Sequence, residues 1–244
     1  VLASVMLVNN ETGAVNPVEA MTREIKRRGL QTLFHTDAIQ GFMKLPFTVK
    51  TLGADLLSIS GHKLHGPKGV GALYIKKGLR LPPFILGGGQ EREMRSGTEA
   101  LPAVAGFGEA VRLASAEREK TTAAVREVYD HTVSLLGDKL PEALLLSPIT
   151  PGQDNSPYIL SLSLPGYKSE VLMNYLEAEG ICVAKSSACK KGARSHVLEA
   201  MKLKSDMIDG ALRVSFSRWS TKEEAAYFVD KLSDAARKLY KVLK

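Results

Sequence analysis

Apolar and polar positions follow two rhythms along this chain. Short runs that are almost continuously apolar, or that alternate with period two, are typical of strands, whereas longer stretches with apolar residues every three to four positions are typical of helices. The pattern predicts strands at 1–8, 32–35, 55–60, 71–76, 144–146, 158–164, 181–184 and 212–216, and helices at 17–28, 98–136, 168–179 and 221–242. Strands that alternate with helices indicate an α/β architecture.

Two stretches suggest how the chain is organised. The run 1–8 is nearly continuous in apolar residues, so we expect a strand that is buried on both faces. Because such a strand is already under way at Val1, we expect this chain to be the later part of a longer one. The long helix predicted from about residue 98 indicates a domain boundary, with 1–115 in a first domain and 116–244 in a second that includes most of the helix.

Composition narrows the class of protein. The chain has 244 residues, of which 44% are hydrophobic and 24% charged, and this excludes a disordered chain. Its apolar runs are far shorter than the roughly 20 residues that cross a bilayer. The two cysteines, Cys182 and Cys189, cannot form a disulfide framework, which favours a reducing, cytoplasmic location.

The richest polar cluster follows the strand predicted at 55–60. A P-loop does not fit the sequence from 61 to 68, because Pro67 intrudes and no Ser or Thr follows Lys68. A dinucleotide fingerprint from Gly69 lacks its third glycine. His62 and His65 have no partner motif for zinc, so we expect no metal site.

Lys63 is the remaining candidate in this cluster. A lysine amine can form a Schiff base with a carbonyl cofactor. Ser60 and His62 could hold an anionic phosphate, and the neighbouring glycines would allow close backbone approach. Asp37 follows the neighbouring predicted strand and could face a pyridinium nitrogen, as pyridoxal phosphate requires. The alternative interpretation is a basic turn with surface lysines.

The segment Ser-Gly-His-Lys-Leu-His-Gly-Pro-Lys-Gly-Val-Gly at 60–71 resembles the lysine segment of NifS/IscS-type cysteine desulfurases, within the class V aminotransferase family. Similar motifs follow in family order at 8–13, 35–40, 87–91, 95–98, 187–189 and 212–215. The resemblance implies a PLP-dependent transferase of fold type I that lacks its N-terminal part. We therefore expect part of the large domain, with a mainly parallel sheet, and a C-terminal α+β small domain.

The resemblance also implies a role for each matching residue, with pyridoxal 5'-phosphate as the cofactor. Lys63 would bind the cofactor covalently and later shuttle a proton. The other cofactor contacts would come from Asp37 at the ring nitrogen, Gln40 at the phenolic oxygen, Ser60 and His62 at the phosphate, and Thr98 reaching in from the second subunit of a homodimer. Asn10 and Arg213 would orient the substrate carboxylate.

Cys189 is the implied nucleophile. It would attack the sulfur of L-cysteine, carry a persulfide and leave L-alanine as the product. The residues themselves favour a reactive thiol, because Lys185, Lys190 and Lys191 would stabilise a thiolate in this Ser/Ala/Gly-rich stretch. Cys182, flanked by apolar residues in a predicted strand, suits an inert thiol.

The net charge of +7 has a specific origin. Residues 185–244 hold 14 Lys and Arg against 7 Asp and Glu, which accounts for the whole excess. Clustered cations favour nucleic-acid phosphates in general. Since this cluster surrounds Cys189, we interpret it as thiolate stabilisation and a docking face for an acidic sulfur acceptor or scaffold protein, and we do not expect direct nucleic-acid binding.

Three functions stay open on the sequence alone. The first is a cysteine desulfurase that is completed by its missing N-terminal segment. The second is a related class V aminotransferase or a selenocysteine lyase. The third is a catalytically silent, truncated binding module. A cysteine in the Ser-Ser-Ala-Cys segment at 186–189 argues against transamination, which needs no thiol.

Overall fold

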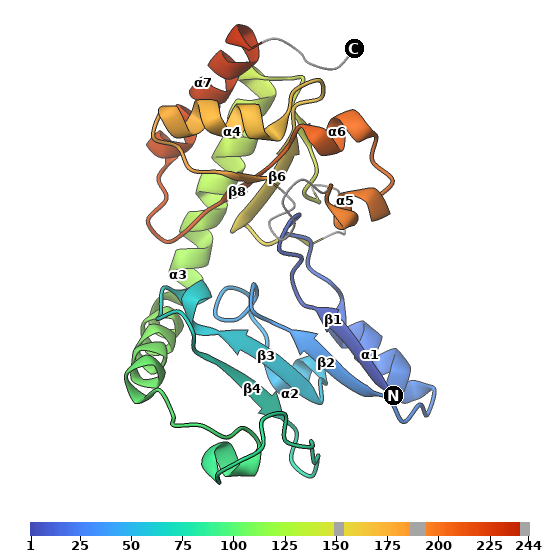
Figure 1. The fold of residues 1–244 in the computed structure, drawn as a ribbon. Coiled ribbons are helices and arrows are strands. Elements are labelled where there is room, and N and C mark those ends of the chain that lie inside the picture. The colour runs from blue at the N-terminus through green and yellow to red at the C-terminus, as the bar shows by residue number, and fades with distance from the viewer. Residues whose placement is uncertain (149–153, 186–193, 240–244) are drawn as a thin grey trace. The chain divides into compact units, whose positions relative to one another are not determined.

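A computed structural model describes residues 1–148, 154–185 and 194–239 of the chain. The chain divides into two compact units, Val1–Val8 with Asn16–Arg118, and Asn9–Val15 with Glu119–Lys244. The long helix α3 (Leu101–Lys139) contributes residues to both units (Figure 1). The division that the sequence predicts at 115/116 does not anticipate that Asn9–Val15 belongs to the second unit.

Unit 1 is built on a four-stranded sheet in the order β1 (Leu2–Met6), β2 (Leu33–Asp37), β3 (Leu56–Ser60), β4 (Gly71–Ile75). The first three strands are parallel and β4 is antiparallel to β3. Helices α1 (Val18–Arg27) and α2 (Val49–Leu52) and the 3-10 turns η1 (Gly61–Leu64) and η2 (Gln90–Glu93) complete the unit.

The first strand is more exposed in this structure than its apolar run predicts. Val1 is 99% exposed and Leu2 is 56% exposed. Among the described strands β1 pairs with β2 alone. Burial begins just beyond β1, where Leu7 and Val8 enter the core.

A buried carboxylate stabilises the centre of the unit 1 sheet. Asp55 precedes β3 and accepts hydrogen bonds from the Phe34 backbone N–H at 3.0 Å and from Lys76 Nζ at 3.0 Å. Burial alone would raise the pKa of Asp55, but these two hydrogen bonds and the charges of Lys76 and Lys26 lower it below its ordinary value. The side chain of Asp55 therefore ties β2 to the end of β4.

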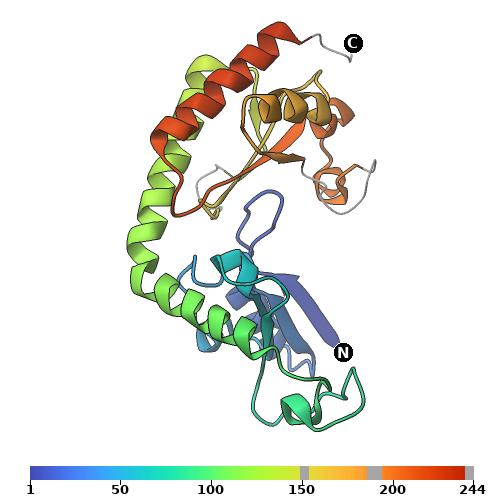
Figure 2. The same ribbon diagram turned by 60° about the vertical axis from the view of Figure 1, so that its left-hand side comes forward.

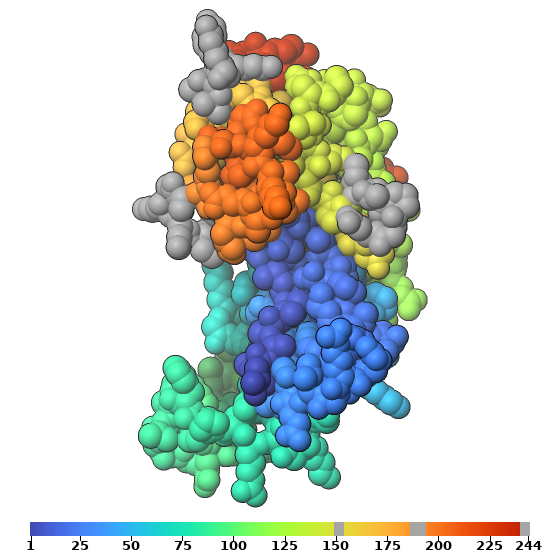
Figure 3. All heavy atoms as spheres, turned by 90° about the vertical axis from the view of Figure 1, so that its right-hand side faces the viewer, coloured from blue at the N-terminus to red at the C-terminus, as the bar shows by residue number. Residues whose placement is uncertain are grey.

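Unit 2 contains a second sheet, in the order β5 (Leu144–Leu145), β6 (Ile159–Ser163), β8 (Ala211–Ser215), β7 (Ala184–Lys185), with every pair antiparallel. Its helices are α4 (Ser169–Ala178), α5 (His196–Ala200), α6 (Ser205–Asp209) and α7 (Lys222–Lys238). Figure 3 shows α5 and α6 (orange) together on one face of this unit. The pattern did not predict these two helices, because five residues are too few to display a helical period.

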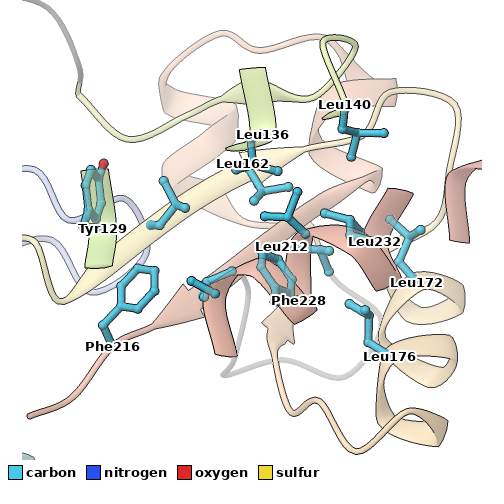
Figure 4. Close-up of a cluster of buried hydrophobic side chains, with 14 of the residues drawn as sticks. Tyr129, Leu136, Leu140, Leu162, Leu172, Leu176, Leu212, Phe216, Phe228 and Leu232 are labelled. Carbon is cyan, nitrogen blue, oxygen red and sulfur yellow. The ribbon is translucent and has the colours of Figure 1, made fainter. Parts of the chain in front are cut away.

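The core of unit 2 packs the central strands against three helices. Leu160, Leu162 and Leu212 are fully buried, as is Leu176 on α4. Figure 4 shows these strands surrounded by side chains from α3, α4 and α7, among them Tyr129, Leu136, Leu172, Phe228 and Leu232. Protein interiors are close-packed, so these side chains fix the spacing between the strands and the helices of unit 2.

Helix α7 runs beside the part of α3 that belongs to unit 2 (Figure 2). Two ion pairs join them, Lys139 to Asp230 at 2.6 Å and Lys222 to Glu127 at 3.0 Å. A capping box at Thr221 starts α7 one residue later than the pattern predicts. Although α3 is 39 residues long, neither it nor any other described helix is long and apolar enough to cross a membrane.

Candidate active site

The first group of predicted site residues lies where the parallel strands of unit 1 end. Asp37 is the last residue of β2 and lies opposite Ser58 of β3, so Ser60 follows two residues further along the same edge. Asp37 is half-buried, and its Oδ1 accepts a hydrogen bond from the Ile39 backbone N–H at 2.9 Å. This turn holds the carboxylate at the carboxyl end of the sheet, the usual place for a ligand site in open α/β sheets.

Lys63 lies in the short turn η1, which starts directly after β3. Ser60 Oγ and His62 Nδ1 are 2.7 Å apart, so the two expected phosphate contacts are already neighbours. The His62 side chain is exposed, whereas Lys63 is half-buried. The structure therefore brings Asp37, Ser60, His62 and Lys63 to one end of one sheet.

The glycines of this segment serve the chain's own packing. A Cβ on Gly71 would lie 2.6 Å from the Ile59 carbonyl oxygen, and one on Gly66 would lie 3.0 Å from the Gly61 carbonyl oxygen. A Cβ on Gly61 would press on Val70 and on the ring of Phe107. These contacts give the three glycines a role in the chain's own packing, and the expectation that the glycines allow close approach to a phosphate stays a prediction.

Lys44 is a second lysine of unit 1 whose charge is coupled to that of Lys63, and no motif in the sequence points to it. Lys44 lies in the turn after Asp37, and its pKa is lowered to about 8, first by burial and then by the positive charge of Lys63. The signal in the sequence is a single cation between apolar neighbours, Met43 and Leu45. The electrostatic coupling means that the Lys44 and Lys63 amines lie in one another's field.

Gln40 and Thr98 differ in their placement. Gln40 is half-buried in the turn that follows Asp37, where Gly41 N–H donates to the Ala38 carbonyl. Thr98 is exposed on a separate segment, held upstream by the hydrogen bond from Ser96 Oγ to the Gly88 carbonyl at 2.9 Å. In the part of the chain that the structure describes, no hydrogen bond links Thr98 to Ser60 or His62, and its role across a dimer stays a prediction.

The second group of predicted residues lies in unit 2. Arg213 comes from the central strand β8, paired with Ser161 of β6 on one side and Ala184 of β7 on the other. Its Nη1 donates to the Asn10 carbonyl oxygen at 3.1 Å, which brings the two expected carboxylate-binding residues into contact. The Arg213 Nε is buried and has no hydrogen-bond partner among the described residues, so the guanidinium keeps unused donor capacity.

Cys189, with Lys190 and Lys191, lies outside the described residues. The chain on either side is described. Lys185, in β7, forms an ion pair with Glu170 at 2.9 Å, so part of the positive charge expected to stabilise a thiolate is offset by a carboxylate. Arg194 forms two hydrogen bonds with Asp209.

Cys182 differs from its predicted setting. The strand expected at 181–184 begins at Ala184, and Cys182 lies before it with an exposed side chain. Within the part of the chain that the structure describes, β7 pairs with Leu212 and Arg213 of β8. Because the Cys182 thiol is exposed to solvent, Cys182 is a matched control for Cys189.

Glu11 and Ser195 form a buried pair that sequence reasoning missed. Ser195 Oγ donates to Glu11 Oε2 at 2.5 Å, and the two residues are 6% and 3% exposed. Ser195 also caps α5, since its Oγ accepts from the Leu198 N–H at 3.1 Å. The only signal in the sequence is a serine placed before a short apolar stretch, which is typical of a helix start.

Among the described residues no group of three or more His, Cys, Asp or Glu could hold a metal ion.

Comparisons with known proteins match nearly the whole chain. The family model described as aminotransferase class-V matches residues 1–228. A relative described as putative cysteine desulfurase IscS 1 of Bacillus subtilis (strain 168) is 38% identical over 243 residues, covering 98% of this chain and 62% of the relative. A cysteine desulfurase of Cereibacter sphaeroides is 40% identical over 226 residues, covering 91% of this chain and 56% of the relative.

Solved structures agree with these relatives. A NifS-like protein superposes with a TM-score of 0.88 at 37% identity, covering 98% of this chain and 61% of that one. A NifS-like protein from Rickettsia africae ESF-5 gives 0.87 at 28% identity, covering 97% and 62%. The likeness confirms the predicted fold class, fold type I with part of the large domain and a C-terminal small domain. The chain spans about three fifths of the length of these relatives.

Proposed function

The chain belongs to the aminotransferase class-V family, and we propose that it acts as a cysteine desulfurase, converting L-cysteine to L-alanine with a persulfide on Cys189. The observation that carries the proposal is Lys63 in the turn after β3, with Asp37 at the end of the neighbouring strand. The Ser-Ala-Cys segment at 187–189 selects sulfur transfer over transamination, because transamination needs no nucleophilic thiol.

The residues at the end of the unit 1 sheet fit pyridoxal 5'-phosphate. They offer an amine, a carboxylate on the adjacent strand, and a serine and histidine pair for an anionic group. When bound, this cofactor supplies a carbonyl for the substrate amine and an electron sink for the adjacent carbon.

The unit 1 residues would hold the cofactor and transfer a proton, each according to its chemistry. The Lys63 amine would hold the cofactor through its carbonyl and would accept and return the proton at the substrate α-carbon. The Asp37 carboxylate would hold the ring nitrogen in its protonated form, and Gln40 would donate to the phenolic oxygen. Ser60 and His62 would hold the phosphate, with Thr98 contributed by the second subunit of a homodimer. Lys44, whose own pKa is lowered by burial and by the charge of Lys63, would add a second amine in the field of Lys63.

The unit 2 residues would hold the substrate and carry its sulfur. Arg213 binds the substrate carboxylate, for which a guanidinium fork is well shaped, and the Asn10 carbonyl holds that guanidinium in place. The Cys189 thiolate attacks the substrate sulfur, so that a sulfur–sulfur bond forms as the carbon–sulfur bond breaks. The electron pair of the broken bond stays on the substrate carbon, which takes up a proton and becomes the methyl group of L-alanine.

We place the protein in the cytoplasm, as a homodimer that passes its persulfide sulfur to an acidic acceptor or scaffold protein. The basic residues of 185–244 support this choice of acceptor, since complementary charge speeds association. Iron–sulfur cluster assembly is the kind of process that consumes sulfur in this form.

The experiment is to supply pyridoxal 5'-phosphate and L-cysteine and to measure the cofactor absorbance band, sulfide and L-alanine together. We expect the band to appear, and alanine and sulfide to form in equal amounts when a reductant is present. Alanine formed only with a keto-acid acceptor would indicate an aminotransferase. Faster turnover of L-selenocysteine would indicate a lyase, and no absorbance band would indicate a silent binding module.

A further inference from the structure

The segment Asn9–Val15 is built into unit 2 by buried contacts. The Asn9 side chain accepts from the Glu11 and Thr12 backbone N–H groups at 2.9 and 3.0 Å, which fixes a tight turn. The Thr12 carbonyl accepts from Ser147 Oγ at 2.6 Å, and Ser147 also accepts from the Ser161 N–H of β6. The turn is thus held to the central sheet of unit 2 by its backbone.

Asn10 contacts Arg213 of the proposed substrate site, and Glu11, the next residue, is buried. The Asn10 carbonyl binds Arg213 Nη1, whereas the Glu11 carboxylate is buried and binds Ser195. The described part of the chain contains no ion pair to Glu11. A buried carboxylate is costly without a cation, so a glutamate here requires a compensating gain.

That gain is the hydrogen bond that the carboxyl group of Glu11 accepts from Ser195 Oγ. The Glu11–Ser195 bond is 2.5 Å long, and Ser195 is itself anchored as the N-cap of α5. The Asn10–Glu11 peptide therefore binds Arg213 through its carbonyl and Asn9 Oδ1 through its N–H, while the side chain of Glu11 binds Ser195.

We propose that Glu11, through Ser195, is a positioning residue that fixes the Asn10 carbonyl against Arg213 and so sets the guanidinium for the substrate carboxylate. The inference rests on the proposed function and deepens it, because it assigns a specificity-setting role to a residue that never touches the substrate. Without the Glu11–Ser195 contact the turn keeps its Asn9 hydrogen bonds but loses its tie to α5, so the Asn10 carbonyl can shift relative to Arg213.

The test compares two amines that differ only in the carboxylate, L-alanine and ethylamine. Their dissociation constants are measured from the absorbance change of the cofactor-loaded protein. We expect Glu11→Ala and Ser195→Ala to weaken L-alanine binding roughly tenfold, as the loss of one oriented hydrogen bond implies, with ethylamine binding unchanged within about twofold. KM for L-cysteine should rise by a similar factor with little change in kcat.

Conservative variants separate positioning from folding. Glu11→Gln keeps an acceptor oxygen and Ser195→Thr keeps the hydroxyl, so both should bind L-alanine within about threefold of the parent protein. Glu199→Gln, an exposed carboxylate on α5, is the matched control and should change neither constant. If the alanine variants fail to fold, the two conservative variants still decide, because a tenfold loss in either overturns the proposal.

Two results would overturn the positioning role while leaving the function intact: equal loss for L-alanine and ethylamine, or no loss for either. If the parent protein neither binds L-alanine nor forms it from L-cysteine, the proposed function fails, and the positioning role fails with it.

Discussion

Arg194 binds Asp209 through two parallel hydrogen bonds, Nε to Oδ1 at 2.8 Å and Nη2 to Oδ2 at 3.0 Å. Lys168 adds a third contact to the same carboxylate at 2.7 Å. The Arg194 hydrogen bonds are the largest cause that lowers the pKa of Asp209 from its ordinary 3.8 to about 2, against the opposing effect of burial. The pair fixes the described chain at Arg194 to the end of α6.

This pair predicts a specific dependence of stability on pH. Because the folded pKa lies below the unfolded one, the contribution is complete above about pH 4 and is lost as pH falls through about 2. We expect Asp209→Asn to lower the free energy of unfolding by about 2 kcal/mol at pH 7, and by progressively less as pH approaches 2. Urea unfolding between pH 7 and pH 2 measures this loss, and Asp138→Asn, at an exposed aspartate, is the control. A loss that did not vary with pH would contradict the pKa assignment.

A second prediction concerns the contribution of Asp55, in unit 1, to the free energy of unfolding. Asp55→Ala leaves the Phe34 N–H buried without a partner and should cost about 2–3 kcal/mol of unfolding free energy. Asp55→Asn keeps an acceptor oxygen for Phe34 and loses mainly the contact with Lys76, which is half exposed, so its cost should be clearly smaller. Equal costs in urea titrations would mean that the backbone hydrogen bond is not the main contribution.

Lys44 should titrate near pH 8 in the cofactor-free protein. Its folded pKa is below that of an unfolded lysine, so stability should rise as pH increases from about 8 to about 10.4. Lys63→Met removes one cause of the shift and should raise the pKa of Lys44. The pKa should stay below 10.5 because burial is the larger cause. NMR of ¹³C-methylated lysines measures this directly, and Lys68→Met, an exposed neighbour, should leave Lys44 unmoved.

We expect opposite effects on persulfide formation from replacing the two cysteines. Cys189→Ser should abolish persulfide formation, seen as the loss of the one-sulfur mass increase after incubation with L-cysteine, and should retain the cofactor absorbance band. Cys182→Ser should retain both, although its thiol is exposed. Persulfide that persisted in Cys189→Ser and disappeared in Cys182→Ser would reverse the assignment.

Local patterns were enough to predict the elements that carry the proposed chemistry. The strand that ends at Ser60, the turn with Lys63 and the long helix follow from periodicity and from polar residues placed after apolar runs, and the strand before it is predicted to end two residues short of Asp37. These features depend on neighbours a few residues away. The fold class required the further step of resemblance to a family, because periodicity alone does not specify how two sheets are divided along one chain.

Long-range pairing was beyond local patterns. Glu11 and Ser195 are 184 positions apart, and nothing near either residue shows that a carboxylate and a hydroxyl will be buried together. Exposure of β1 depends on which strands lie beside it, which its own apolar run cannot indicate. The coupling of Lys44 to Lys63 likewise depends on two turns meeting in space.

The membership of Asn9–Val15 in unit 2 has a practical consequence for dissecting the molecule. Cutting the gene at residue 118 does not separate two self-sufficient halves, because the downstream half would lack the seven residues that satisfy Ser147, Ser195 and Arg213. A downstream half expressed alone should therefore bind a synthetic peptide of residues 9–15, in the manner of a fragment complementation pair. Circular permutation that joins this peptide to residue 119 would be the covalent equivalent.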